Sequence, residues 1–387
     1  MRFPEFSGEW ETKSINDLAD VIGGGTPDTT VKSYWDGEIQ WFTPSEIGKN
    51  KFVDASLRTI TEDGLNNSSA KLLPPNTILL SSRATIGECS LSLRECATNQ
   101  GFQSLVSKKC NVDFLYYLIQ TKKKDLIRKS CGSTFLEISA NEVRKIQVSV
   151  PSDVEQQKIA GLLSLIDKRI ATQNKIIEDL KKLKSAIIEK TFNENYSNKI
   201  RLRDVGSYIR GLTYSSDDVV ESNGIFVMRS NNIINGSSLD YHNNIVSVNK
   251  QILTEQQLQT GDIVICMANG SSSLVGKSSF YDGDCSTPIT VGAFCGIYRS
   301  KEPIVKWLFQ TNKYRRYIWN SLQGGNGAIA NLNGDDILRM SFSIPATPAK
   351  DNRIKLLTSV DTLLESNISL CDLYISQKLY LLRQMFI

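Results

Sequence analysis

Apolar residues recur every three or four positions through two long segments, residues 152–192 and 346–387. The repeating positions of the first segment are Leu163, Ile166, Ile170, Gln173, Ile177, Leu180, Lys184 and Ile187. Those of the second are Leu357, Val360, Leu364, Asn367, Cys371, Tyr374, Lys378 and Leu381. Alternating steps of three and four residues are typical of a coiled-coil helix. We therefore predict one long helix in each segment, with an apolar seam made by Ile166, Ile170, Ile177, Leu180, Val360, Leu364, Tyr374 and Leu381.

The chain also contains an internal repeat. Residues 138–167 align without gaps with residues 332–361, at a constant offset of 194 positions. Weaker matches follow in the same order: residues 15–18 with 202–205, residues 73–80 with 258–265, and residues 117–121 with 307–311. These matches predict two similar halves that diverged mainly in their loops.

Each half combines short β-rich runs with helical segments. Runs such as 77–81, 146–150 and 263–267 are separated by turns rich in Gly, Asn and Ser. Residues 112–128 and 303–322 have helical patterns. We therefore expect an α+β fold, with two similar α/β domains at residues 1–151 and 197–345. Residues 152–196 and 346–387 are expected to form spacer helices between and after these domains.

A single amphipathic helix of this length would expose its apolar stripe to water, so each long helix needs a partner. Pairing of the two helices within one chain would form an antiparallel coiled coil and make the molecule pseudo-twofold symmetric. Pairing with a second copy of the protein is the alternative. In either case, polar seam residues such as Gln173 and Lys184 would fix the register at some cost in stability.

Composition narrows the functional classes. The residues are 40% hydrophobic and 22% charged, and no apolar run approaches the ~18 residues of a membrane span. The start of the chain lacks the basic segment and apolar core of a secretory signal, so we expect a cytoplasmic location. The eight cysteines include no Cys-x-x-Cys pair and His242 is the single histidine, so we expect reduced cysteines and no metal site.

Catalytic motifs are scarce. One histidine allows at most one Ser–His or Cys–His pair, and no carboxylate pattern is repeated. Residues 271–278 approach the phosphate-binding loop pattern, but they begin with Ser271 instead of Gly and are followed by a β-like run instead of a helix. We therefore expect no catalytic residues and no bound nucleotide, and we interpret the chain as a non-enzyme.

Polar residues that can read base edges cluster in loops at equivalent places in both halves. Arg, Asn and Ser side chains form hydrogen bonds with bases in a DNA groove. The DNA-binding candidates are Ser45, Ser82, Arg83 and Thr85 in the first half, and Arg229, Asn231, Asn232, Asn269, Ser271 and Lys277 in the second. Taken singly, each is more often a solvated loop side chain, but the matched clustering favours binding. The net charge of +4 adds little to this argument. The basic segments 122–124 and 313–317, the second of which also contains two tyrosines, are compatible with either phosphate contact or simple solvation.

The whole chain resembles the specificity subunits of type I restriction-modification enzymes. The resemblance is carried by Phe3-Pro4-Glu5-Phe6 with Gly8 and Trp10, by residues 41–47 and 97–102, and by Val150-Pro151 followed by residues 155–159. The second half departs from the pattern at residues 287–290 and 349–351.

This resemblance implies two target recognition domains, each of which reads one part of a divided double-stranded DNA sequence. It also implies that two methyltransferase subunits dock on the helices and that motor-nuclease subunits join through the complex. The S-adenosylmethionine would be bound by the methyltransferase partners, with no cofactor in this chain. The alternative is a coiled-coil scaffold or decoy without sequence-specific DNA binding.

Overall fold

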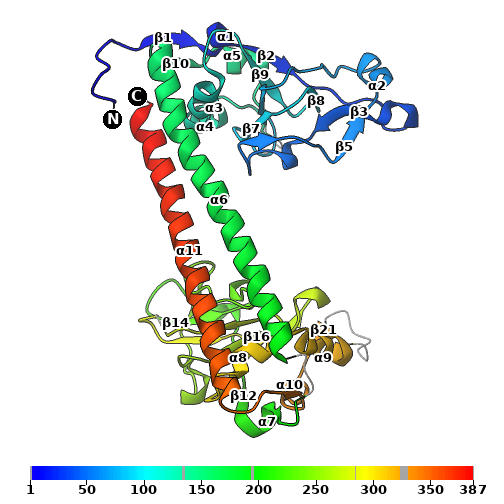
Figure 1. Ribbon diagram of the computed structural model, residues 1–387, viewed down its shortest axis with the longest axis vertical. Coiled ribbons are helices and arrows are strands. Elements are labelled where there is room, and N and C mark those ends of the chain that lie inside the picture. The colour runs from blue at the N-terminus through cyan, green and yellow to red at the C-terminus, as the bar shows by residue number, and fades with distance from the viewer. Residues whose placement is uncertain (1, 133–135, 193–195, 284, 323–329, 387) are drawn as a thin grey trace. The chain divides into compact units, whose positions relative to one another are not determined.

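The predicted repeat and the two predicted long helices are both present in the computed structural model, which describes residues 2–132, 136–192, 196–283, 285–322 and 330–386 (Figure 1). The chain divides into two compact units. Unit 1 comprises Met1–Lys175 and Ile368–Ile387, and unit 2 comprises Ile176–Asn367. Each unit therefore contains an α+β part together with a segment of both long helices.

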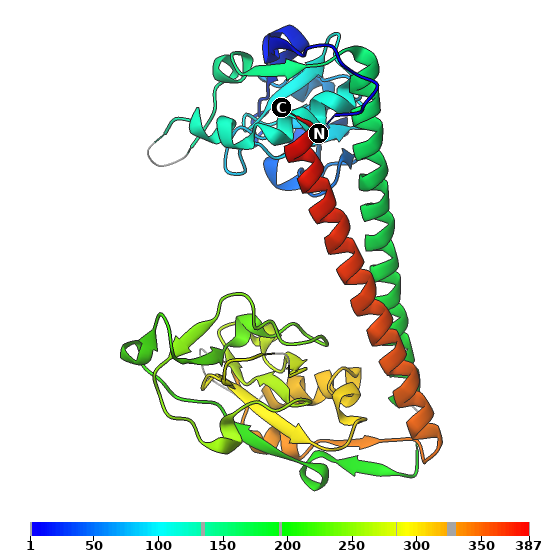
Figure 2. The same ribbon diagram turned by 90° about the vertical axis from the view of Figure 1, so that its left-hand side faces the viewer.

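The long helices are α6 (Asp153–Phe192) and α11 (Ala349–Met385). Each is continuous in both views (Figures 1 and 2). Within unit 1 the two helices run antiparallel, because Asp167 on α6 pairs with Lys378, whereas Asn174, farther along α6, contacts Cys371, earlier on α11. This confirms the expected antiparallel pairing of the two helices within one chain.

Unit 1 is built on a five-stranded sheet, a three-stranded sheet and a two-stranded ribbon. The five-stranded sheet has the order β2 (Ala19–Gly23), β9 (Gln103–Ser107), β6 (Ile78–Leu80), β7 (Cys89–Ser92) and β4 (Phe52–Val53). The three-stranded sheet has the order β5 (Arg58–Ile60), β3 (Trp35–Phe42) and β8 (Cys96–Thr98), and the ribbon pairs β1 (Glu11–Ser14) with β10 (Gln147–Val150). The shorter helices are α1 (Ile15–Leu18), α2 (Glu62–Asn66), α3 (Val112–Thr121), α4 (Lys123–Arg128) and α5 (Ala140–Arg144).

Unit 2 has a related arrangement of strands. One four-stranded sheet has the order β12 (Gly206–Arg210), β20 (Cys295–Ser300), β16 (Ile263–Cys266) and β18 (Ser278–Phe280). A second has the order β13 (Val219–Val220), β15 (Val246–Val248), β14 (Ile225–Met228) and β19 (Ile289–Val291). The remaining pairs are β11 (Lys199–Arg201) with β22 (Ser341–Ser343) and β17 (Ala268–Asn269) with β21 (Ala330–Asn331). The helices are α7 (Leu202–Val205), α8 (Val305–Leu308), α9 (Asn312–Leu322) and α10 (Gly334–Leu338).

The matching strands show that the two halves share a fold. Strand β14 pairs with β19 in parallel, as β3 pairs with β8 in unit 1. The antiparallel pair of β12 with β20 corresponds in the same way to that of β2 with β9. The sequence repeat therefore encodes a repeated α+β fold, as expected.

The core of unit 1 forms where the apolar face of its sheet meets the helices. Helix α3 begins at Asn111, whose side-chain oxygen accepts a hydrogen bond from the Phe114 amide, and this cap directs Phe114 into the core. The ring of Phe114 packs against Trp10 and Phe386, with centroid distances of 6.3 and 5.2 Å. Residues near both ends of the chain thus complete one core.

Seam positions of the long helices are packed within each unit. The side chains of Ile166, Val360, Leu364 and Leu381 are buried, and those of Ile170, Ile177, Leu180 and Tyr374 are half-buried. In unit 2, Ile188 and Phe192 of α6 share a core with Leu357 of α11. Among the described residues, no helix is long and apolar enough to span a membrane.

Candidate nucleic-acid interface

Three loops of unit 1 meet beyond the ends of strands β3, β6 and β8. The amide of Asn99, after β8, donates a hydrogen bond of 3.1 Å to the Phe42 carbonyl at the end of β3. The amide of Ser82, after β6, donates one of 2.8 Å to the Gly101 carbonyl. Loops 43–46, 81–88 and 99–102 therefore lie side by side, and the first two contain all four polar candidates of this half.

The same two hydrogen bonds recur in unit 2. The amide of Gly292 donates to the Met228 carbonyl and that of Met267 donates to the Phe294 carbonyl, each at 2.8 Å. Loops 229–232, 267–277 and 292–295 meet as a result. The structure thus brings the six candidates of the second half together on these three loops. We call the three loops of each unit its loop edge, and the two loop edges are equivalent in the repeat.

Side-chain contacts to Ser230 hold two of these loops together. The amide nitrogen of Asn269 lies 3.3 Å from the Ser230 hydroxyl, and the ammonium group of Lys277 lies 3.4 Å from the Ser230 carbonyl. Arg229, Asn231 and Ser271 are exposed beside them. The edge of unit 2 therefore offers a guanidinium, an amide and a hydroxyl group to a ligand.

Asn232 has a structural role at this edge. Residues Ser230–Asn232 form a short 3-10 turn, and the Asn232 side-chain oxygen accepts a hydrogen bond of 2.9 Å from the Arg229 amide. Its amide nitrogen donates to the carbonyls of Asp240 and Asn243, and the side chain is fully buried. Because the protein already satisfies this amide, Asn232 positions the loop and is not available to contact a base.

Glu46 has the same structural role in unit 1, where it positions the equivalent loop. Its carboxylate accepts hydrogen bonds from the amides of Thr43, at 2.8 Å, and Leu57, at 2.6 Å, and it caps the turn Pro44–Glu46. Ser45 is exposed on this turn. The repeat therefore conserves a capped turn in both units and places an exposed polar residue on each.

The other candidates of unit 1 differ in accessibility. The Thr85 side chain is exposed and donates a hydrogen bond to the Ser81 hydroxyl. Arg83 forms an ion pair of 2.8 Å with Glu137. The hydroxyl of Ser82 is buried, with no hydrogen-bond partner among the described residues. Ser45, Arg83 and Thr85 are thus accessible from solvent, whereas Ser82 is not.

Three further residues lie at these loop edges but are not among the DNA-binding candidates predicted from the sequence. Glu137 is distant in sequence from its partner Arg83, and Gln100 accepts a hydrogen bond from Thr26. Phe294 is an exposed aromatic residue on the turn of unit 2 that corresponds to the turn carrying Gly101 in unit 1. An alignment of residues 98–105 with residues 291–298 places Phe294 opposite Gly101. This match does not stand out in the sequence because the two segments are only weakly similar.

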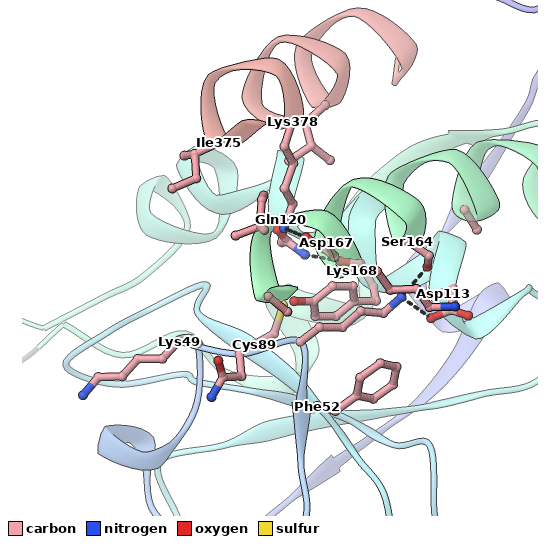
Figure 3. A pocket seen from close by; sticks show the side chains of 18 of the residues that line it. Lys49, Phe52, Cys89, Asp113, Gln120, Ser164, Asp167, Lys168, Ile375 and Lys378 are labelled. Atoms are coloured by element: carbon pink, nitrogen blue, oxygen red, sulfur yellow. Dashed lines mark hydrogen bonds and ion pairs between the residues drawn. The ribbon is translucent and has the colours of Figure 1, made fainter. Parts of the chain in front are cut away.

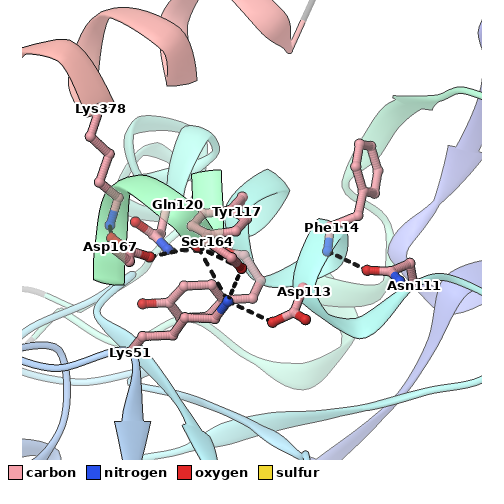
Figure 4. A network of polar contacts seen from close by, with 10 residues as sticks. Lys51, Asn111, Asp113, Phe114, Tyr117, Gln120, Ser164, Asp167 and Lys378 are labelled. Atoms are coloured by element: carbon pink, nitrogen blue, oxygen red, sulfur yellow. Dashed lines mark hydrogen bonds and ion pairs between the residues drawn. The ribbon is translucent and has the colours of Figure 1, made fainter. Parts of the chain in front are cut away.

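A polar network ties unit 1 to its helices (Figure 4). The Tyr117 hydroxyl donates a hydrogen bond of 2.5 Å to Asp167, which also pairs with Lys378 at 2.7 Å. Lys51 donates to the Ser164 hydroxyl and pairs with Asp113, both at 2.6 Å. Burial raises the pKa of Tyr117, and its bond to the Asp167 carboxylate raises it further. The network therefore keeps Tyr117 neutral and serves as a structural link between α3, α6 and α11.

A groove of about 990 Å³ lies beside this network, between loop 48–52, α3, α6 and α11 (Figure 3). None of its lining residues is a polar candidate from the loops. Cys89 lines it, but burial raises the pKa of this thiol to about 12, so it is protonated at neutral pH and is a poor nucleophile. Within the described ranges, no group of three His, Cys, Asp or Glu residues is placed to hold a metal ion.

Residues 7–182 match the family model described as the type I restriction modification DNA specificity domain. The MjaIX specificity subunit of Methanocaldococcus jannaschii, a type I restriction enzyme subunit, is 38% identical over 189 residues, which are 48% of this chain and 44% of that relative. The EcoR124I/EcoR124II specificity subunit of Escherichia coli is 31% identical over 181 residues, which are 45% of this chain and 44% of that relative. The chain thus spans less than half the length of these curated relatives.

Two solved structures share the fold over the full chain. The S subunit of a type I restriction-modification system from M. genitalium superposes with a TM-score of 0.57 at 15% identity, covering 100% of this chain and 99% of that one. A structure from a study of complex assembly and conformational transition in the type I R-M system gives 0.53 at 14% identity, covering 98% and 96%. These structures extend the similarity of fold from residues 7–182 to unit 2.

Proposed function

We propose that this chain is a specificity subunit of the type I restriction-modification kind, as the match of residues 7–182 and the similarity to curated specificity subunits suggest, and that unit 1 and unit 2 each read one part of a divided double-stranded DNA target. The observation that carries the proposal is the equivalence of the two loop edges. The same two backbone hydrogen bonds join three loops in each unit, whereas the side chains on those loops differ. A repeated scaffold with different polar side chains suits the recognition of two different base sequences.

The chain supplies recognition, and partner subunits supply the chemistry. Methylation of a base requires that the base leave the helical stack and enter a closed pocket. The candidate edges are open loop surfaces that present Arg, Asn and Ser side chains. The resemblance to type I specificity subunits implies that two methyltransferase subunits carry out the methyl transfer with their S-adenosylmethionine, and that motor-nuclease subunits in the same complex cleave the DNA.

Exposed apolar residues support docking of the methyltransferase subunits on the long helices. Leu165 and Leu183 on α6, and Leu363 and Leu373 on α11, each expose about half or more of their side-chain surface. Apolar surface concentrated in this way on helices marks a protein interaction site. The helices thus have two roles, since one face joins the α+β part of each unit and another binds the partners.

The helices also determine how many bases between the two target parts are left unread. Helix α6 has 40 residues, which at 1.5 Å per residue span about 60 Å. One turn of B-DNA is ~34 Å, so the length of this helix exceeds one turn. Removal of one heptad from both helices is expected to shorten the unread spacer in the methylated sequence.

The test is to express the chain with its methyltransferase subunits and map methylated adenines across the genome. A divided motif is expected for the wild-type complex. Arg229→Ala is expected to relax only the part read by unit 2, and Arg83→Ala only the other part. Absence of any sequence-specific methylation, or a change in both parts from either variant, would contradict reading by separate units.

A further inference from the structure

Phe294 lies at the tip of a tight turn in unit 2. The amide of Cys295 donates a hydrogen bond of 2.8 Å to the Gly292 carbonyl and closes the turn. The Phe294 carbonyl in turn accepts hydrogen bonds from the amides of Met267 and Ala268, at 2.8 and 3.1 Å. The backbone is therefore held at both sides, yet the side chain is 67% exposed. A ring held in water by a fixed backbone contributes little to the core of unit 2.

The backbone partners of this turn are each followed in sequence by a residue with a hydrogen-bonding side chain. The bond from Gly292 to Met228 places the turn next to Arg229, and the bond from Ala268 places it next to Asn269. Arg229 is exposed, and Asn269 is half-buried. An apolar side chain thus stands between the two loops of unit 2 that carry the DNA-binding candidates.

The equivalent turn of unit 1 has a different chemistry. Gly101 occupies the place of Phe294, because its carbonyl accepts the corresponding hydrogen bond from Ser82. The residues before it are Asn99 and Gln100, both of which carry amides. The scaffold is the same, but unit 1 presents hydrogen-bonding groups where unit 2 presents an aromatic ring.

We propose that Phe294 contacts the C5-methyl group of a thymine in the part of the target read by unit 2. This inference rests on the proposed function of unit 2 as a DNA reader. In the major groove the other three bases present hydrogen-bond donors and acceptors, whereas thymine adds a methyl group that suits an apolar side chain. Arg229 and Asn231 are then placed to read neighbouring bases through hydrogen bonds, and Phe294 distinguishes a T·A pair from C·G.

The test uses DNA in which deoxyuridine replaces each thymine of the recognised sequence in turn, because this change removes only the methyl group. The complex of the full chain with its methyltransferase subunits is the protein used, and the dissociation constant for each duplex is the measurement. We expect one replacement in the part read by unit 2 to weaken wild-type binding about fourfold, the change for about 0.8 kcal/mol of one buried methyl group.

The Phe294→Ala complex is expected to bind the thymine and uracil duplexes equally. Phe294→Leu keeps an apolar side chain and is expected to retain part of the preference. Leu253→Ala removes an exposed apolar side chain of unit 2 that lies on none of the three loops, and it serves as a control that retains the full preference.

Three results would overturn the inference while leaving DNA reading intact. The first is a unit 2 target without a T·A pair, and the second is wild-type binding that no uracil replacement weakens. The third is an equal loss of affinity for every duplex on Phe294→Ala, which would indicate a ring wedged between bases instead of a methyl contact. Failure of the proposed function differs, because the wild-type complex would then bind all duplexes without sequence preference.

Discussion

The ammonium nitrogen of Lys378 on α11 lies 2.7 Å from a carboxylate oxygen of Asp167 on α6. The same relationship occurs in unit 2, where Lys184 lies 2.6 Å from Asp361. Asp361 follows Asp167, and Lys378 follows Lys184, by the 194 positions of the internal repeat. Each lysine also lies over an aromatic ring, 5.6 Å from the centroid of Tyr117 for Lys378 and 5.4 Å from that of Trp307 for Lys184. One ion pair encoded in the repeat thus fixes the helix register twice.

Asp361→Asn is expected to destabilise unit 2 strongly. Asp361 also pairs with Lys306 at 3.2 Å, so its loss leaves two lysines without a carboxylate. The side chains of Lys184 and Asp361 are only 8% and 9% exposed, and removal of one partner of a buried pair costs about 3–5 kcal/mol. Urea unfolding would measure this change. Asp179→Asn, at an exposed site of α6, is the matched control and should change stability little.

A charge reversal tests whether the ion pair itself is responsible. In the equivalent pair of unit 1, where no second lysine pairs with the aspartate, the double variant Asp167→Lys with Lys378→Asp should recover part of the stability that either single change removes. If the double variant loses the sum of the two single losses, the register is not held by this pair.

Glu137→Gln is expected to strengthen DNA binding by the complex. Glu137 pairs with Arg83 at a partly exposed site, and such pairs contribute roughly 0.2–1 kcal/mol. Release of Arg83 should therefore tighten binding by up to about fivefold, with a steeper dependence on salt concentration if the guanidinium meets a phosphate. Titration at two salt concentrations measures both effects. Glu88→Gln, which frees Lys123 and leaves the Arg83 pair intact, is the control, and an equal effect from both changes would exclude a specific role for Glu137.

Gly24→Ala and Gly211→Ala are expected to disturb the loop edges. A Cβ atom at Gly24 would lie 2.0 Å from the Asn99 carbonyl oxygen, and one at Gly211 would lie 2.2 Å from the Gly292 carbonyl oxygen. Both contacts are with backbone, so the loops must shift, at a cost of about 1–3 kcal/mol. Thermal unfolding and DNA affinity should both fall. Gly8→Ala, where a Cβ atom has open space, should have no such effect.

The buried cysteines predict a loss of stability at alkaline pH. Burial raises the pKa of Cys96, Cys110 and Cys295 from 9.0 to about 12. A thiol held neutral in the folded state stabilises it fully below the unfolded pKa of 9.0, and this contribution is lost as the pH rises toward 12. Urea unfolding at pH 7, 9 and 10 should therefore show decreasing stability.

Thiol labelling checks the same assignment by a different route. Cys131 is exposed, so a thiol reagent should modify it first in the folded protein, and the buried thiols should react only on unfolding. Cys131→Ser should remove the fastest phase, and the half-buried Cys285 should account for any slower labelling of the folded protein. A second fast-reacting buried thiol in that variant would contradict the pKa assignments.

The sequence pattern predicts the long helices closely because their periodicity is local. The predicted segments are residues 152–192 and 346–387. The observed helices are α6, Asp153–Phe192, and α11, Ala349–Met385. The ungapped repeat likewise predicts the shared fold, since strands at equivalent positions pair in the same way. The polar seam residues Lys184 and Lys378 also stand out in the heptads, but their partners do not, because aspartate at these places has no distinct pattern.

The roles of single loop residues depend on tertiary contacts that the pattern does not contain. Asn232 has the composition of a base reader, yet neighbouring backbone groups satisfy its amide and bury it. Glu137 meets Arg83 only because the chain folds back after α4. Phe294 is apolar, so a search for polar clusters passes over it, although it lies between two candidate loops.

Unit 2 is one uninterrupted stretch of chain, Ile176–Asn367, whereas unit 1 is split around it. Unit 2 therefore needs no residue beyond Asn367 to complete its fold, whereas the first 175 residues lack the strip of α11 that closes their core until residues 368–386 are made. At ordinary translation rates of about 5–20 residues per second, roughly ten to forty seconds pass between the synthesis of residue 175 and that of residue 386. During that interval Phe114 lacks its packing partner Phe386, so the core of the nascent unit 1 is open to chaperones and proteases.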